Sequence, residues 1–183
     1  VRRLFLSLPW LGLRHVGTHP AGTRAVEPRA AALRISLRHQ DPDRLPASTS
    51  QPELLERIAA LNADPAIHGI LVQMPLPAHI AAQRIVEAIA FDKDVDGLHA
   101  MNAGLTLMGV PHFRSCTPYG VMKMLGHTDV AIEGAHAVVL GRSNMVGKPM
   151  AMLLLAANAT VTIAHSKTRD LAAVTRSADI LIA

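Results

Sequence analysis

The stretch VVLGRSNMVGKPMAMLLL, Val138–Leu155, decides the fold of the C-terminal part of the chain. A β-branched run ends at Gly141, a polar loop ends at Gly147, and an apolar helical run follows. This order predicts a strand, a phosphate loop and a helix whose N-terminus offers free N–H groups to an anion. A G-x-G-x-x-G fingerprint would have glycine where this chain has Ser143 and Val146. We therefore expect a nucleotide loop of a different kind, in which the Ser143 hydroxyl assists the phosphates.

Two amphipathic helices are predicted earlier in the chain. Ser50 and Glu53 have the spacing of a capping box, which marks the start of the first helix. Its apolar face has four members: Leu54, Leu55, Ile58 and Leu61. The second helix covers residues 81–90, and its apolar face has four members: Ala82, Ile85, Val86 and Ile89.

Strand patterns alternate with helix patterns along most of the chain. The expected strands are 69–74, 135–141, 160–165 and 179–183, and further helices are expected after Pro118 and over 149–159 and 169–178. Strands joined to helices by short loops indicate parallel sheets with right-handed crossovers, so the predicted fold class is α/β. The last part reads as one mononucleotide-binding half of a doubly wound sheet. Because the chain stops there, we expect it to be a fragment.

The bulk composition narrows the class of protein. A single cysteine, Cys116, cannot form an internal disulfide, which favours a reducing compartment and a cytoplasmic location. No apolar run is long enough to span a bilayer, so no membrane partner is expected. The start, VRRLFLSLPWLGL, has the order of a signal peptide but no initiator methionine or cleavage site, and we interpret it as domain interior. The net charge is +4, but the arginines are scattered without an aromatic pattern, so no nucleic-acid partner is expected.

The end of the strand over 160–165 indicates which dinucleotide the loop accepts. NAD-binding folds place an acidic residue there to hold the ribose 2′-hydroxyl. This chain instead has His165, Ser166 and Lys167, and Arg142 lies in the preceding loop. These donors suit a 2′-phosphate, which predicts NADP as the cofactor. The alternative is that the glycine merely ends a strand and Arg142 is solvated.

Several blocks, in this order and spacing, resemble one known family, that of bifunctional methylenetetrahydrofolate dehydrogenase/methenyltetrahydrofolate cyclohydrolase. The blocks are GILVQMPLP, KDVDGLHAMNAG, SCTPYGVMKML, VVLGRSNMVGKPMAMLLL and ATVTIAHSKTRDL. The resemblance is strong from Ser50 to Ala183 and weaker back to Pro9. Relative to the family, a short N-terminal helix and roughly the last third are missing.

The resemblance implies a two-domain α/β enzyme that is usually a homodimer. A folate-binding catalytic domain would cover 1–120, and a Rossmann-like NADP-binding domain would cover 121–183, each incomplete at its outer end. The implied reactions are oxidation of 5,10-methylenetetrahydrofolate to the methenyl form with NADP, and hydrolysis of that product to 10-formyltetrahydrofolate. The partners would be tetrahydrofolate derivatives, and no metal is implied.

The resemblance also assigns the cofactor residues. Gly141, Arg142 and Ser143 would hold the cofactor phosphates. Ser166 would contact the 2′-phosphate, and Thr117 would lie beside the nicotinamide. It answers the question raised by the missing glycines, since Gly-Arg-Ser with a later Val-Gly is this family's own form of the loop.

Two residues are candidates for the folate side. Gln73 follows an expected strand, where an amide can hold a catalytic ammonium or a substrate carbonyl, or merely satisfy a neighbouring loop. Asp96 precedes Gly97, which is typical of a turn. Within the family pattern we prefer a catalytic and substrate-binding role for both, because an ionised carboxylate can accept both N–H groups on the edge of the pterin.

The pattern breaks in the segment that should supply the catalytic pair. The family's tyrosine, which would stack on the folate, aligns with Ala25, and its proton-transfer lysine aligns with Arg29. Arginine keeps the charge but does not exchange a proton near neutral pH, and Pro28 would kink the expected helix. Residues 22–45 are either genuinely diverged or the product of a reading-frame error in a gene of high GC content. The expected function is therefore an impaired enzyme, and the alternative is a catalytically dead NADP-binding or dimerisation module.

Overall fold

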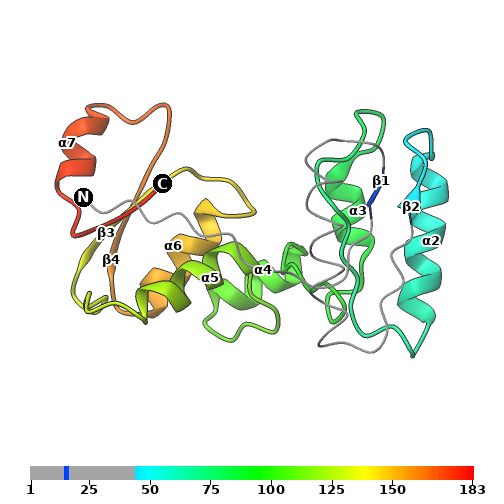
Figure 1. Ribbon diagram of the computed structural model, residues 1–183, viewed down its shortest axis with the longest axis horizontal. Helices are drawn as coiled ribbons and strands as arrows, with labels where there is room; N and C mark the ends of the chain where they lie inside the picture. Colours follow the sequence, from blue (N-terminus) through cyan, green and yellow to red (C-terminus); the bar gives the residue numbers. More distant parts are fainter. Residues whose placement is uncertain (1–14, 17–43) are drawn as a thin grey trace. The chain divides into compact units, whose positions relative to one another are not determined.

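The computed structural model describes residues 15–16 and 44–183, and it divides the chain into two compact units, 1–95 and 96–183. Figure 1 shows the elements of each unit. Two short strands, β1 (His15–Val16) and β2 (Arg44–Leu45), pair in parallel in the first unit. Residues 22–43, which include most of the divergent segment, lie outside the described residues.

Helix α2 (Gln51–Ala63) begins where the capping pattern predicts. Ser50 is the N-cap, and its hydroxyl oxygen accepts the N–H of Glu53 at 3.3 Å. This bond satisfies one of the N–H groups that a helix start leaves without a partner. The predicted face is confirmed, because Leu54, Ile58 and Leu61 are buried and Leu55 packs against them.

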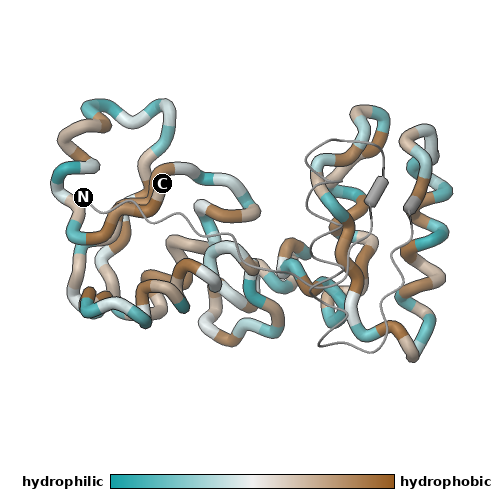
Figure 2. The backbone as a smooth tube through the Cα atoms, viewed as in Figure 1, coloured by the Kyte–Doolittle hydropathy of each residue, from teal (hydrophilic) through white to brown (hydrophobic). Residues whose placement is uncertain are grey.

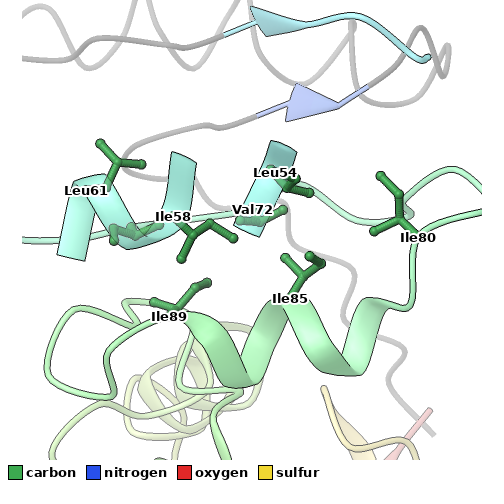
Figure 3. Packing of buried hydrophobic residues seen from close by; sticks show 8 residues of the cluster. Leu54, Ile58, Leu61, Val72, Ile80, Ile85 and Ile89 are labelled. Carbon is green, nitrogen blue, oxygen red and sulfur yellow. The ribbon is translucent and has the colours of Figure 1, made fainter. Parts of the chain in front are cut away.

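Helix α3 (Ala82–Ala88) packs its apolar face against α2. Figure 3 shows Ile85 and Ile89 pointing toward Ile58 and its neighbours on α2. Burial of Ile85, Val86 and Ile89 confirms most of the predicted face. The prediction was wrong for Ala82, which is exposed together with all of residues 81–84. The first turn of α3 extends beyond the packed face, and periodicity alone does not show where a face stops being covered.

The strand predicted over 69–74 is present only as isolated bridge pairing in the described structure. Ile70 pairs in parallel with Asp94, and its N–H donates to the Lys93 carbonyl oxygen at 2.7 Å. Ile70, Leu71 and Val72 are nevertheless buried, so the apolar run correctly indicated a core segment. An apolar run predicts burial, whereas a continuous ladder also requires a neighbour of matching length, which the run itself does not encode.

Lys93 and Asn62 join the end of α2 to the segment after α3. The Lys93 ammonium donates to three carbonyl oxygens at the end of α2, those of Leu61 at 3.2 Å, Asn62 at 2.7 Å and Asp64 at 2.9 Å. The Asn62 side chain donates to the Ala88 carbonyl at 2.7 Å and accepts the Ala90 N–H at 3.0 Å. A cation suits a helix C-terminus, whose last carbonyls lack helical partners.

Replacement of Lys93 tests how much its bonds to the end of α2 stabilise the folded chain. Lys93→Met keeps most of the alkyl chain and removes all three donors, so we expect the free energy of unfolding to fall by about 2 kcal/mol. Chemical denaturation of parent and variant measures the difference, with the exposed Lys167→Met as the matched control. Equal free energies of unfolding for the Lys93 variant and the control would show that the three Lys93 bonds contribute nothing to stability.

The second unit contains the predicted β-α-β-α-β unit. Its strands are β3 (His136–Leu140), β4 (Thr160–Ala164) and β5 (Ile180–Ile182), and its crossover helices are α6 (Gly147–Ala156) and α7 (Leu171–Arg176). All pairing is parallel, with Val138 opposite both Thr162 and Leu181. The order is β4-β3-β5, so the third strand lies beside the first. In the mononucleotide-binding half predicted from the sequence the third strand would lie beside the second, so that part of the prediction was wrong. In sheets of this order, ligands bind outside the carboxyl ends of the strands where the order reverses, here at β3 and β5.

The sheet separates the two crossover helices. Because β4 and β5 flank β3, right-handed crossovers place α6 and α7 on opposite faces, and Figure 1 shows them on either side of the strands. The core lies on the α6 face, where Met150 and Leu154 pack against Ala137 and Val139. Figure 2 shows β3 and β5 as largely hydrophobic and the segment after β4 as largely hydrophilic. The polar segments are therefore concentrated in the loops that follow the strands.

Two helices begin before the proline that was predicted to open them, and one helix was not predicted. Helix α5 (Cys116–Leu125) begins before Pro118, and α6 begins before Pro149. Proline is tolerated in a first turn because the N–H groups there have no helical partners, so it does not mark the first residue. Helix α4 (Ala100–Leu107) was not predicted; its N-cap is His99, whose ring nitrogen Nδ1 accepts the Met101 N–H at 3.0 Å.

The predicted boundary between a folate-binding part, 1–120, and a cofactor-binding part, 121–183, falls inside α5. The compact units instead divide between residues 95 and 96, before α4. A functional boundary at residue 120 stays a prediction.

Candidate functional site

The loop after β3 closes on itself through two glycines. Gly141 has φ of 121°, which residues with a Cβ rarely adopt, and its N–H donates to the Ala164 carbonyl oxygen at 2.8 Å. A Cβ on Gly147 would overlap the Gly141 carbonyl oxygen and would lie 2.6 Å from its carbonyl carbon and 2.8 Å from the Arg142 nitrogen. The start of α6 therefore touches the backbone at the end of β3. Glycine is required at both ends of the loop, as the sequence predicts for a tight turn.

Ser143 caps the beginning of α6. Its hydroxyl oxygen accepts the N–H of Val146 at 3.1 Å and of Gly147 at 3.3 Å. Its carbonyl oxygen accepts the Lys148 N–H at 3.0 Å, and the Lys148 ammonium donates to the Asn144 side-chain oxygen at 2.7 Å. The prediction that the helix start offers free N–H groups was wrong for Val146, Gly147 and Lys148, whose N–H groups all have acceptors on Ser143. A hydroxyl with both acceptor positions used still has its O–H proton, so Ser143 can serve a ligand as a donor.

The turn after β4 lies at the neighbouring strand end. The His165 N–H donates to Thr168 Oγ1 at 2.8 Å, and the Thr168 N–H donates to the His165 carbonyl at 2.8 Å. His165 Nδ1 accepts the Lys167 N–H at 3.1 Å, so a neutral ring carries its proton on Nε2. Ser166, Lys167 and Arg142 are exposed. Because the Gly141–Ala164 bond joins the two strand ends, these three residues belong to adjacent loops with no acidic side chain between residues 165 and 169.

A third segment, the start of α5, joins the loop through Ser115. This buried residue donates its hydroxyl proton to the Met145 carbonyl oxygen at 2.6 Å. Thr117, the predicted nicotinamide neighbour, is exposed two residues later in the first turn of α5. Sequence reasoning did not identify Ser115, and the only available signal was a serine immediately before a helix.

Asp96 lies near the start of α5 because Gly97, the next residue, packs against Arg114 and Ser115. Gly97 has φ of 65°, and a Cβ there would lie 2.9 Å from both the Arg114 carbonyl carbon and the Ser115 nitrogen. The Asp96–Gly97 turn is thus pressed against the start of α5, and Asp96 is half-buried. The second unit therefore brings together Asp96, the helix start that carries Thr117, and the loop after β3.

The remaining predicted site residues belong to the first unit. Gln73 is half-buried, and its Nε2 donates to the Met74 carbonyl oxygen at 2.8 Å. That bond uses one of two amide N–H groups and leaves the amide oxygen available. Ala25 and Arg29 lie outside the described residues, so their predicted roles stay predictions.

Residues 44–183 contain no group of three or more His, Cys, Asp or Glu side chains arranged to hold a metal ion. Within that same range, no helix has both the length and the apolar character needed to cross a membrane.

Two family models match the chain in succession. The catalytic domain of tetrahydrofolate dehydrogenase/cyclohydrolase matches residues 9–96, and the NAD(P)-binding domain of the same family matches residues 115–183. The first match ends at Asp96 and the second begins at Ser115. The Asp96–Gly97 turn packs against Ser115 at the start of α5, so the end of the first match and the beginning of the second are neighbours in the structure.

Curated relatives and solved structures agree with these models. The bifunctional protein FolD of Burkholderia thailandensis is 58% identical over 175 residues, which cover 96% of this chain and 61% of the relative. FolD of Bordetella avium is 58% identical over 174 residues, covering 95% and 61%. The chain thus spans about three fifths of the length of these relatives.

Two solved structures share the fold. The bifunctional enzyme FolD of Campylobacter jejuni has a TM-score of 0.90 at 44% identity, covering 94% of this chain and 62% of that one. The methylenetetrahydrofolate dehydrogenase-cyclohydrolase of Trypanosoma brucei, complexed with NADP cofactor and inhibitor, has a TM-score of 0.86 at 33% identity, covering 93% and 60%. With both domain models matched in order and the loop of the second unit formed as described, the chain belongs to the tetrahydrofolate dehydrogenase/cyclohydrolase family.

Proposed function

We propose that this chain acts in folate one-carbon metabolism as an NADP-dependent methylenetetrahydrofolate dehydrogenase with an impaired methenyltetrahydrofolate cyclohydrolase activity. Its product would be 5,10-methenyltetrahydrofolate, formed weakly, and conversion of that product to 10-formyltetrahydrofolate would proceed at about the uncatalysed rate. The observation that carries the proposal is the closed loop over 141–147 beside an acid-free turn over 165–168. We further propose that it works as a homodimer in the cytoplasm, on tetrahydrofolate derivatives.

The adenosine end of NADP would be held by the two adjacent loops. Arg142 supplies a permanent cation and Ser166 a hydroxyl, both exposed at neighbouring strand ends. A 2′-phosphate accepts strong charge-assisted bonds from such donors, whereas the 2′-hydroxyl of NAD would find no carboxylate there. Ser143 would donate its remaining proton to the pyrophosphate, beside Gly141.

The reacting end would lie at the start of α5. Thr117 would contact the nicotinamide, and the Asp96 carboxylate would accept the N–H groups of the pterin. The catalytic and substrate-binding role of Gln73, in the first unit, stays a prediction. Hydride transfer requires the two rings to be held face to face, which is mainly a matter of positioning. Ala25 and Arg29, at the tyrosine and lysine positions, would supply neither a stacking ring nor a proton that can be exchanged.

Cofactor choice gives the most direct test of the proposal. Arg142→Ala is expected to weaken NADP binding by about tenfold or more, since a charge-assisted bond contributes roughly 1.5–3 kcal/mol, and to leave NAD binding nearly unchanged. Isothermal titration with both dinucleotides measures the two affinities. The exposed Arg176→Ala, in the last turn of α7, is the matched control. Equal weakening of NAD and NADP would contradict the assignment, because only the 2′-phosphate distinguishes them.

A second candidate function is a catalytically dead NADP-binding or dimerisation module. It is favoured by the identity of Ala25 and Arg29 in the segment that should supply the catalytic pair. Translation of the gene in its three forward reading frames distinguishes genuine divergence from a reading-frame error. Recovery of the tyrosine and the lysine in another frame would identify a reading-frame error. Turnover of methylenetetrahydrofolate with NADP separates the enzyme from the inactive module.

A further inference from the structure

Ser115 occupies an N-cap position but does not cap its helix. An N-cap serine usually accepts an N–H from the second or third helical residue. In α5 the third residue is Pro118, which has no N–H, and the Ser115 side chain makes no capping bond. Its hydroxyl instead donates to the Met145 carbonyl oxygen, 30 residues away, at 2.6 Å. The residue is only 5% exposed, so this bond is shielded from water.

The Met145 carbonyl belongs to the part of the loop after β3 that lies between Ser143 and Gly147, which we call its far side. The two ends of the loop, Gly141 and Gly147, are fixed by the Gly141–Ala164 bond and by the contact between Gly147 and Gly141. Ser115 adds a link to a different element, the start of α5, which carries Thr117 two residues later. A shift of the far side would therefore change the distance between the pyrophosphate donors and the nicotinamide neighbour.

The backbone of Ser115 is contacted by a different segment, the Asp96–Gly97 turn. The Gly97 Cα approaches so closely that a Cβ would lie 2.9 Å from the Ser115 nitrogen. Ser115 thus lies between the Asp96–Gly97 turn and the loop after β3, in contact with both. The link from the Ser115 side chain requires only its hydroxyl.

We propose that Ser115 is a positioning residue that holds the far side of the phosphate loop in register with Thr117, so that both halves of the dinucleotide are bound at once. The inference rests on the proposed function, since it specifies how the same site is assembled. Arg142 and Ser166, the proposed 2′-phosphate donors, each lie within two residues of the Gly141–Ala164 bond, whereas the bond from Ser115 ends at Met145. Loss of the hydroxyl should therefore weaken the pyrophosphate and nicotinamide end selectively.

The experiment compares two ligands on the same variants. Ser115→Ala is expected to weaken NADP binding by about five- to tenfold, the value of one hydrogen bond, and to change binding of adenosine 2′-monophosphate by less than about twofold. Ser115→Thr retains the hydroxyl and should recover most of the NADP affinity. Ser177→Ala is the matched control, because it also removes a hydroxyl that donates to a backbone carbonyl, at 2.8 Å, within α7 and its C-cap.

A second variant perturbs Ser115 from the Asp96–Gly97 turn. Gly97→Ala adds a Cβ against the Ser115 nitrogen and should reproduce the selective loss of NADP affinity, even if the added methyl of Ser115→Thr is not accommodated. Equal loss of both ligands in Ser115→Ala, or no loss of either, would overturn the inference while the parent still binds NADP. Failure of the parent to bind NADP at all would overturn the proposed function, and this inference with it.

Discussion

The chain is expected to hydrolyse methenyltetrahydrofolate no faster than the buffer does. Water addition and ring opening require protons to be moved, and a general acid–base group at that step typically contributes about 10²–10⁴-fold. The proposed position of that group holds Arg29, whose guanidinium stays protonated and cannot cycle a proton. The loss of absorbance of the methenyl compound, followed with and without the chain, measures the rate.

The matching rescue separates the missing base from a general loss of structure. Arg29→Lys alone should not restore hydrolysis, because Ala25 still lacks the ring that stacks on the folate and Pro28 still interrupts the expected helix. Ala25→Tyr, Pro28→Asn and Arg29→Lys together should restore it. Arg24→Lys, a change of the same type nearby, serves as the control. Hydrolysis by the unmodified chain well above the buffer rate would sink the hypothesis.

The second large effect is expected at the loop after β3. Gly147→Ala would place a Cβ against the backbone of Gly141 and Arg142, and backbone atoms cannot turn aside as a flexible side chain can. Relief requires separation of α6 from the end of β3. We expect the free energy of unfolding to fall by about 3 kcal/mol, at the upper end of overpacking effects, and NADP affinity to fall by about 100-fold as the phosphate contacts are displaced.

A helical glycine without such a neighbour is the control for this substitution. Gly104 in α4 has no atom within 4 Å of an added Cβ, so Gly104→Ala should be neutral or stabilising through helix propensity. Denaturant unfolding and NADP titration compare the two variants. A Gly147→Ala protein as stable and as tight a binder as Gly104→Ala would show that the close approach has no functional role.

The elements that local sequence predicts well are those with their own start signals or continuous β-branched runs. The cap at Ser50 and the strands on either side of α6 were confirmed. Helix α4 was missed because its cap is a histidine ring nitrogen rather than a serine, threonine or aspartate oxygen. The extended run at Ile70 was overestimated because its pairing depends on a partner distant in sequence. The order β4-β3-β5 also could not be derived from the sequence. The residues of a crossover helix do not show on which side of the first strand the next strand will pair.

The candidate site shows the same division between local and distant information. Both glycines of the loop were identified from the strand and helix patterns around them. The use of the Ser143 oxygen by two N–H groups was not foreseen, because the hydroxyl had been assigned to the ligand alone. Ser115 was not identified because its partner is a backbone carbonyl 30 residues away, and any residue type can supply that acceptor. Side-chain patterns carry little information about contacts to backbone.

The central place of β3 has a consequence for how this unit fluctuates. Within the described part of the chain, β4 and β5 each pair with β3, so β3 has a bonded neighbour along both of its edges. Its amide protons can exchange with solvent only after an outer strand has separated, whereas the outer strands can fray singly. Gly141 directly follows this strand. The phosphate loop thus follows directly on the segment of the sheet that opens last, and within this sheet it loses only its Gly141–Ala164 bond when the end of β4 separates.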